Sequence, residues 1–189
     1  MKIGMIVLCV SLLWIVSEIV LAILKRCQSK DPNNHDRFSQ LLLWLTIISC
    51  VFAGIFVRIK GIGYIPLKSH ALMLMGLVLI ILGLAIRWIA IFTLRRYFTV
   101  NVAIVNNHKI IKSGLYKYIR HPSYTGTLLS FLGLGLAFSN WLSIAIIFIP
   151  ILIAFLHRIN IEERVLVQTF GDEYLNYVKS TKRLVPRVY

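Results

Sequence analysis

The chain has 189 residues, 58% of them hydrophobic, and a mean hydropathy of +0.79. A soluble domain of this size would rarely carry so little polar surface, so the composition predicts a membrane protein. A net charge of +14 would suggest nucleic-acid binding in a soluble protein, but here the basic residues lie between long apolar runs rather than along one face, so we interpret them as topology signals. The three cysteines, Cys9, Cys27 and Cys50, are widely separated and predict neither a disulfide framework nor a metal site.

The apolar runs predict an all-α, polytopic integral membrane helix bundle that forms a single membrane domain over residues 1–189. A bilayer core of about 30 Å requires roughly 20 helical residues. The first run exceeds the apolar region of a signal peptide and ends at Lys25 and Arg26, so we expect it to remain in the mature protein. We expect about five transmembrane helices, near residues 3–24, 39–58, 70–93, 122–138 and 141–157.

The basic residues predict the orientation of these helices. With five spans, four Lys and Arg residues fall on one side and sixteen on the other, and Arg87 lies inside a span. Because cytoplasmic loops carry the excess of basic residues, we expect the N-terminus outside and the C-terminus in the cytoplasm. Segment 94–121 and the tail 158–189 would then both face the cytosol.

Two ionisable residues, Glu18 and Arg87, fall within the first and third predicted spans. Each lies about six residues from the predicted cytoplasmic end, which is roughly 9 Å deep at 1.5 Å per residue. Charges in hydrocarbon are costly unless they are paired or hydrated. We expect a buried ion pair between the two helices, and the alternative is that both residues line a substrate path.

The polar segment before the fourth span contains a turn at Ser113-Gly114 and ends in Arg120-His121-Pro122. Pro122 suits the first position of a helix, where its missing N–H group costs nothing. His121 would then lie at a helix N-terminus, a location suited to an anionic group. The alternative is a simple helix start with a solvated histidine.

Small residues recur along one stripe of the fourth span, at Gly126, Ser130, Gly133 and Ala137. Such a stripe is typical of close helix contact, and we expect it to pack against the fifth helix of a tight hairpin that turns at Ser139-Asn140. The alternative for Gly133 and Gly135 is a close approach of the backbone to a ligand.

The tail after the fifth span holds four of the seven acidic residues, and Arg158 and Glu162 are four residues apart. Residues at this spacing share a helix face. An exposed salt bridge would explain the pair, but acids just below the membrane in so basic a protein could also bind a cationic or hydroxyl-rich ligand. We expect Gly171 to end this helix.

The combination GLYKYIRHPSYTG, a helical hairpin, Arg158 followed by Glu162-Glu163, and FGDEYLNY resembles the isoprenylcysteine carboxyl methyltransferase family and, more loosely, the phospholipid N-methyltransferases. The likeness runs from about Leu94 to Pro186. It implies an integral membrane methyltransferase that uses S-adenosylmethionine (SAM), with three N-terminal helices in 1–93 and a cofactor-binding and catalytic region in 94–189.

The resemblance also implies the site residues. Arg158 would handle the substrate carboxylate and Glu162 would act in both the catalytic and the cofactor site. The implied cofactor contacts are His108, Lys109, Ile110, Ile111, Tyr116, His121, Pro122, Ser123, Tyr124, Glu162 and Glu163, with Gly133 and Gly135 at lower weight.

The expected reaction is methyl esterification of a lipophilic, isoprenylcysteine-like acceptor that enters from the bilayer. We expect membrane lipid as a partner, and neither nucleic acid nor metal. Two alternatives stay open, namely a phospholipid or small-amine N-methyltransferase, and a non-catalytic transporter or scaffold that uses Glu18 and Arg87 as an intramembrane relay.

Overall fold

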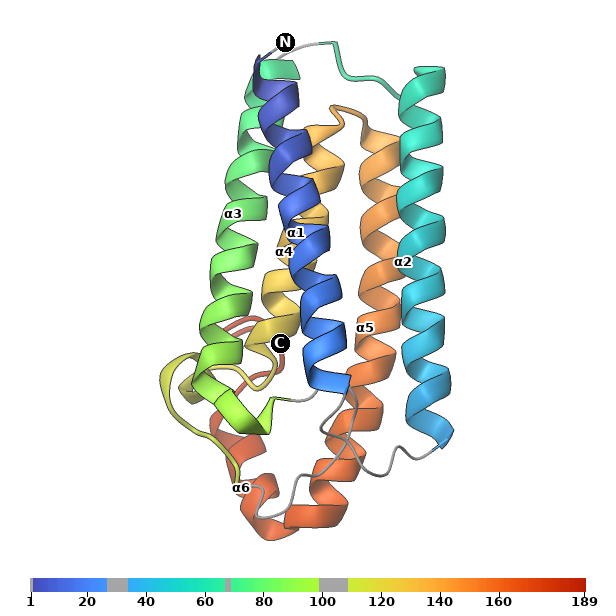
Figure 1. Ribbon diagram of the computed structural model, residues 1–189. Helices are drawn as coiled ribbons and strands as arrows, with labels where there is room; N and C mark the ends of the chain where they lie inside the picture. Colours follow the sequence, from blue (N-terminus) through green and yellow to red (C-terminus); the bar gives the residue numbers. More distant parts are fainter. Residues whose placement is uncertain (1, 27–33, 67–68, 99–108) are drawn as a thin grey trace.

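The computed structural model describes residues 2–26, 34–66, 69–98 and 109–189 (Figure 1). Its described residues form helices, two short 3₁₀ turns and connecting loops, with two isolated β-bridges and no strand, so the predicted all-α fold is confirmed. The α-helices are α1 (Lys2–Arg26), α2 (Asn34–Lys60), α3 (Ser69–Leu94), α4 (Pro122–Ala137), α5 (Trp141–Phe170) and α6 (Asp172–Ser180), and the 3₁₀ turns are η1 (Arg95–Tyr97) and η2 (Gly114–Lys117).

Within the described part of the chain, four helices are long and apolar enough to cross a membrane: α1, α2, α3 and α5. The predicted span at 122–138 corresponds to α4, whose 16 residues rise only about 24 Å at 1.5 Å per residue. The predicted span at 141–157 is the first part of α5, which continues without a break to Phe170. Its 30 residues rise about 45 Å, so the last turns extend beyond a bilayer core of about 30 Å.

The closest helix contact joins α3 and α4. A side chain on Gly126 would come within 2.5 Å of the carbonyl oxygen of Gly83, and one on Gly133 within 2.6 Å of that of Gly76. Only glycine allows the two backbones to approach this closely. The prediction that the small-residue stripe packs against the fifth helix is therefore wrong for these two glycines, because small residues at matching positions of α3 form the complementary surface. Gly135 lies against Ile144 of α5.

The loop between α4 and α5 consists of Phe138, Ser139 and Asn140. Asn140 caps α5, since its side chain accepts a hydrogen bond from the backbone of Ser143 at 3.0 Å. Its amide also donates to the carbonyl oxygen of Ile62, which ties the hairpin to the end of α2. At the other end of α5, Gly171 is the C-cap with φ +52°, as the sequence predicted.

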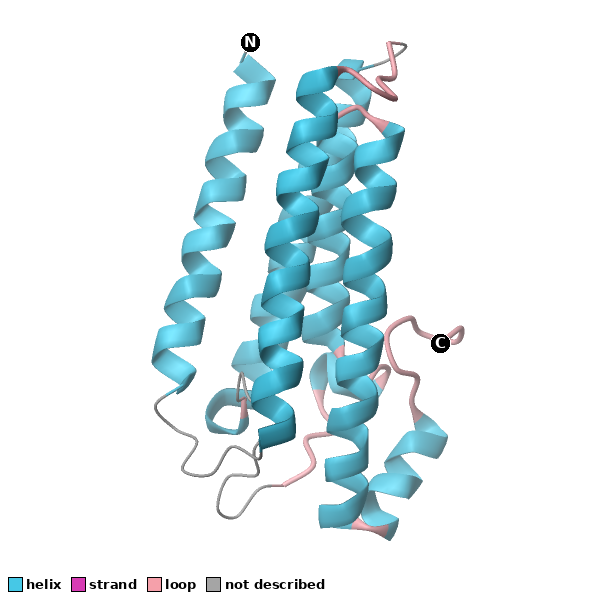
Figure 2. Cartoon of the chain, turned by 90° about the vertical axis from the view of Figure 1, so that its right-hand side faces the viewer, coloured by secondary structure: helices cyan, strands magenta, loops and turns pink. Residues whose placement is uncertain are grey.

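Helix α1 lies at the edge of the bundle (Figure 2). It packs mainly against α3. Its buried residues Val7, Trp14 and Leu21 recur every seven positions and so form one narrow stripe. Trp14 meets Phe131 of α4 edge to face, with ring centroids 4.8 Å apart. Most other apolar side chains of α1 are exposed, as expected of a helix that faces lipid.

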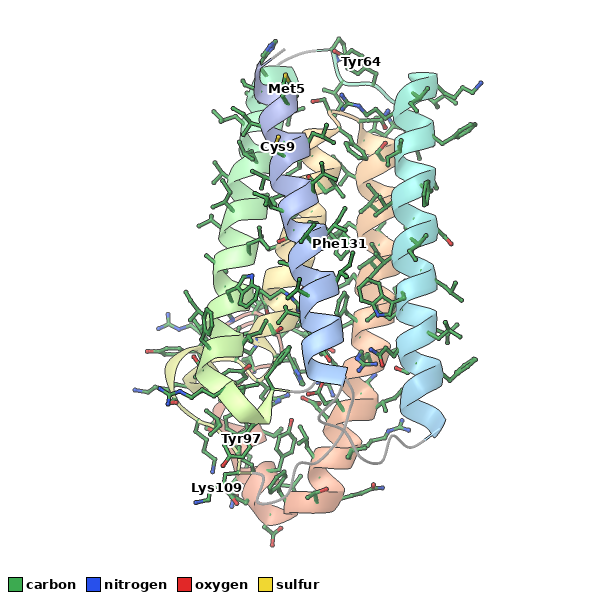
Figure 3. All side chains as sticks on the ribbon, viewed as in Figure 1. Met5, Cys9, Tyr64, Tyr97, Lys109 and Phe131 are labelled. Carbon is green, nitrogen blue, oxygen red and sulfur yellow. The ribbon has the colours of Figure 1, made fainter. Side chains whose placement is uncertain are left out.

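The two ends of the bundle differ in polarity. Met5 and Tyr64 lie at one end, and Tyr97 and Lys109 at the end that carries α6 (Figure 3). Arg58 and Lys60, at the end of α2, belong to the first end. The start of α4, the last turns of α5, α6 and the C-terminal segment all gather at the other end, so the polar parts of the chain form one layer.

Candidate active site

A cavity of about 810 Å³ extends from this polar layer into the helix bundle. Its size lies within the range of cavities that bind small molecules, about 300–1,000 Å³. Leu12 and Ile15 of α1 and Ile48 and Phe52 of α2 belong to its apolar wall. The polar end is lined by side chains from four parts of the chain, including Lys109, His121, Tyr124, Arg158, Glu162 and Tyr174.

Tyr124 links the two residues that were predicted to share a face of α5. Its hydroxyl donates to Oε2 of Glu162 at 2.9 Å and accepts from Nε of Arg158 at 3.2 Å. Arg158 is buried and also approaches the hydroxyl of Ser39 in α2 at 3.4 Å. The structure therefore places the carboxylate of Glu162 and the guanidinium of Arg158 together at one wall of the cavity, and not on the exposed surface of the helix.

His121 caps the N-terminus of α4 and is 5% exposed, so the solvated histidine of the alternative reading does not occur. Its ring stacks on that of Tyr124, with centroids 5.6 Å apart and an interplanar angle of 7°. Nδ1 lies 3.8 Å from Oε2 of Glu162. The histidine thus belongs to the same wall as Tyr124, Arg158 and Glu162.

Glu163 lies behind this wall and binds the C-terminal segment. Its Oε1 accepts from Nε of Arg120 at 2.7 Å and lies 3.3 Å from Nε2 of His121, while Oε2 accepts from Nε of Arg183 at 2.9 Å. Backbone N–H groups of Arg120 and His121 donate to the carbonyls of Lys182 and Arg183. One buried carboxylate with three cationic or ring donors therefore fastens the tail to the start of α4.

Glu18 and Arg87 form an ion pair, as predicted, and both side chains also line the cavity. Arg87 additionally donates to the hydroxyls of Ser123 at 3.0 Å and Thr127 at 2.7 Å. The pair therefore connects α1 and α3 to the start of α4. The predicted connection between the two helices is confirmed, and the alternative that both residues line a substrate path stays a prediction.

The other residues that the resemblance implied fall into four groups. Those that line the cavity are Lys109, Ile110, Ile111, Tyr116 and Ser123. Pro122 and Glu163 lie beside it without lining it, and Gly133 and Gly135 contact neighbouring helices. His108 lies outside the described residues.

Sequence reasoning missed Arg120, Tyr174 and Tyr177 as residues that line the cavity. Tyr174 and Tyr177 are three residues apart and so share one face of α6, which is the signal that could have indicated them. Burial raises the pKa of both phenols and of Tyr116, and nearby carboxylates add to the effect at Tyr116 and Tyr174. The pKa of Tyr177 reaches about 12, so its hydroxyl, like the other two, stays neutral and keeps its proton.

Fold and site together define a polytopic membrane protein with a cavity that is polar at one end and apolar along its length, which suits an amphiphilic ligand. A model of the isoprenylcysteine carboxyl methyltransferase (ICMT) family matches residues 74–168. This segment covers half of the chain and includes most of α3 and nearly all of α4 and α5. The chain belongs to the ICMT family, whose members are integral membrane methyltransferases, and the predicted resemblance is confirmed.

Similar proteins extend the match beyond this segment. Protein-S-isoprenylcysteine O-methyltransferase B of Arabidopsis thaliana is 32% identical over 176 residues, which are 91% of this chain and 87% of that protein. The Saccharomyces cerevisiae enzyme is 32% identical over 134 residues, 69% of this chain and 56% of that one. The solved structure of the eukaryotic intramembrane Ras methyltransferase ICMT matches with a TM-score of 0.59 and 26% identity, over 82% of this chain and 54% of that chain. The chain thus spans little more than half of some of these relatives.

Proposed function

We propose that this protein methylates the carboxylate of a lipophilic, isoprenylcysteine-like acceptor, with SAM as the methyl donor. The observation that carries the proposal is the wall formed by Tyr124, Arg158 and Glu162 at the polar end of an otherwise apolar cavity. Relatives named as isoprenylcysteine O-methyltransferases support this acceptor.

Arg158 is the residue we assign to the acceptor carboxylate. A guanidinium can donate two parallel hydrogen bonds to a carboxylate, and it stays charged at any pH of interest. The acceptor needs no base from the protein, because a carboxylate is already ionised at neutral pH. The chain would therefore contribute alignment of the acceptor and exclusion of water by its apolar walls.

The polar end of the cavity fits the chemistry of SAM, which supplies an electrophilic methyl group when bound. Glu162 has a side chain that is 29% exposed, so its carboxylate can accept hydrogen bonds from an ammonium or a ribose hydroxyl. Lys109 and the start of α4 at His121 favour a carboxylate. We assign the cofactor to these residues together with Ile110, Ile111, Tyr116, Ser123 and Tyr124.

We further propose that this polar end faces the cytosol and that the acceptor enters from the bilayer. The excess of basic residues in 94–121 and 158–189 supports the orientation. Helices α1 and α2 both line the cavity, yet each packs mainly on another helix, α1 on α3 and α2 on α5. An isoprenoid chain that passes between them would bury apolar surface along its whole length.

The purified protein in lipid nanodiscs, incubated with methyl-labelled SAM and a prenylcysteine analogue, tests the proposal. We expect labelled product that releases methanol on base treatment, because methyl esters hydrolyse and methylated amines do not. Arg158→Ala should lower turnover by at least about 100-fold, as expected when a charged orienting group is removed. Glu162→Ala should abolish measurable SAM binding.

Two results would contradict this assignment. Base-stable methylation of an amine would replace carboxyl methylation with N-methylation, and full turnover in Arg158→Ala would remove this residue from the acceptor site. Arg164→Ala is the matched control, because Arg164 is an exposed arginine one and a half turns further along the same helix and does not line the cavity. We expect its turnover to equal that of the unmodified protein.

A further inference from the structure

An aromatic group lines the cavity where α6 meets it, and it consists of Tyr116, Phe170, Tyr174 and Tyr177. The rings of Tyr174 and Tyr177 meet edge to face, with centroids 6.0 Å apart. We refer to these four residues as the aromatic end of the cavity. Planar aromatic side chains favour planar, π-rich ligands, whose rings can stack on them or meet their edges.

The three tyrosine hydroxyls at the aromatic end differ in their hydrogen bonds. The hydroxyl of Tyr177 donates to the backbone carbonyl of Tyr116 at 2.6 Å, and that of Tyr116 lies 3.5 Å from the carbonyl of Ala90. The hydroxyl of Tyr174 is buried and has no hydrogen-bond partner among the described residues, although Tyr174 is only 2% exposed. A buried hydroxyl without a partner costs about 1–3 kcal/mol, so this one calls for an explanation.

Chemistry narrows down the group that would satisfy this hydroxyl. A phenol hydroxyl can donate and accept, but its buried O–H proton is satisfied only by an acceptor atom, and an isoprenoid chain has none. The carboxylates of Glu162 and Glu163 act on it electrostatically more strongly than the guanidinium of Arg120, which disfavours a further anion at this position. A neutral heteroaromatic ring with an acceptor nitrogen satisfies both the hydroxyl and the surrounding rings.

We propose that Tyr174 is a cofactor-binding residue, and that its hydroxyl donates a hydrogen bond to a ring nitrogen of adenine held at the aromatic end of the cavity. The inference rests on the proposed function, because it assigns the adenine moiety of SAM to this end and leaves Arg158 to the acceptor. The sequence spacing places Tyr174 only on the same helix face as Tyr177, and the role proposed for its hydroxyl follows from burial without a partner.

Tyr174→Phe tests the inference, because it removes one oxygen atom and keeps the ring. Titration of the full chain in nanodiscs with S-adenosylhomocysteine and with 5′-methylthioadenosine should give dissociation constants about 3- to 10-fold higher than in the unmodified protein, as for the loss of one neutral hydrogen bond. Both ligands should lose the same factor in affinity, since both carry adenine. A loss confined to S-adenosylhomocysteine would overturn the adenine assignment.

The Tm of the ligand-free protein separates a ligand-binding hydroxyl from a structural one, because loss of a structural hydroxyl would lower the Tm. Removal of an unsatisfied buried hydroxyl should leave the Tm of Tyr174→Phe unchanged or raised. Tyr177→Phe is the matched control, because it breaks the bond to Tyr116, and we expect its Tm to fall by about 2–4 °C. An equal fall in Tyr174→Phe would show a structural partner and refute the inference.

Failure of this inference can be distinguished from failure of the proposed function. If the unmodified protein does not bind S-adenosylhomocysteine at millimolar concentrations, the methyltransferase proposal fails. If it binds and Tyr174→Phe binds equally well, only the role of Tyr174 is refuted.

Discussion

The membrane-spanning parts of α1 and α2 are as apolar as those of α3 and α5, but they are buried to different extents. In the membrane-spanning windows of α1 and α2, only 11% and 6% of the residues are buried, against 28% and 33% in α3 and α5. The family match at residues 74–168 coincides with the more buried region. Hydrophobicity places α1, α2, α3 and α5 in the membrane, whereas close packing joins α3 to α4 and α2 to α5 and leaves α1 the most loosely held helix.

This difference separates two tasks within one bundle. Helices α3 to α5 hold the polar residues in fixed positions, because backbones in contact leave little freedom to the side chains they carry. Helices α1 and α2 both contribute to the apolar wall of the cavity. Helix α2 packs closely on α5, where the hydroxyl of Ser143 donates to the carbonyl oxygen of Gly54 at 2.8 Å, whereas α1 is held mainly by its stripe on α3 and α4 and by the ion pair of Glu18 with Arg87. The loose packing of α1 is compatible with our proposal that the acceptor enters from lipid.

The largest effect should follow from a substitution where the packed helices touch. In Gly126→Leu, the first added carbon alone would lie 2.5 Å from the carbonyl oxygen of Gly83 and 2.7 Å from the backbone nitrogen of Arg87. Backbone cannot give way as a side chain does, so we expect a loss of more than about 3 kcal/mol and no monodisperse protein on size exclusion.

The matched control for this prediction is Gly4→Leu in α1. A side chain at Gly4 would meet only the flexible tip of Met73, at 3.5 Å. We expect normal expression and a Tm within about 3 °C of the unmodified protein. Equal damage from both substitutions would contradict the division between a packed and a loosely packed region.

Sequence alone predicted the helices well, because long apolar runs, Pro122 and Gly171 act locally. It did not predict the partner of the small-residue stripe. Chain proximity favoured α5, whereas glycines at 76 and 83 provide the closer surface on α3, and the pairing of two stripes depends on tertiary structure. The helix end at Gly171 was predicted, but the unbroken continuation of the fifth span into this polar helix was not, since the change from apolar to polar residues does not change the backbone.

An intermediate effect is expected at the ion pair that connects α1 to α3. Glu18→Ala leaves the guanidinium of Arg87 without its carboxylate, which costs about 3–5 kcal/mol in a fully buried pair. Both side chains line the cavity and can be hydrated there, so we expect about 2–3 kcal/mol and a Tm lower by roughly 4–12 °C. Glu18→Gln combined with Arg87→Gln should recover part of the loss, because no unpaired charge remains.

Leu13→Ala serves as the control in α1, since Leu13 is 68% exposed and faces away from the bundle. We expect its Tm to change by less than about 2 °C. If Glu18→Ala were equally mild, the ion pair would not be what fastens α1 to the bundle.

The site was predictable in part, through motifs whose residues are near one another in sequence. Arg158 and Glu162 share a face by helix geometry alone. Their connection through Tyr124, 34 residues before Arg158, depends on how α4 lies beside α5. Tyr174 could not be recognised in the same way, because an unsatisfied hydroxyl is a property of the folded protein.

The smallest effect compares two hydroxyl groups that contact Arg158, one from α4 and one from α2. Tyr124→Phe removes a hydroxyl from the packed region that bonds both Arg158 and Glu162 at 3.2 and 2.9 Å. Ser39→Ala removes one from α2 whose oxygen lies 3.4 Å from the guanidinium, beyond the usual range of a strong hydrogen bond. Hydrogen bonds to charged groups contribute about 1.5–3 kcal/mol. Because the side chain of Glu162 is partly exposed, we place the contribution of the Tyr124 hydroxyl at the lower end of this range. We therefore expect kcat/KM for the acceptor to fall about 10-fold in Tyr124→Phe and less than about 2-fold in Ser39→Ala. A larger loss in Ser39→Ala would mean that α2 positions Arg158. The apolar lining formed by α1 and α2 and the polar site would then no longer be separate parts of the molecule.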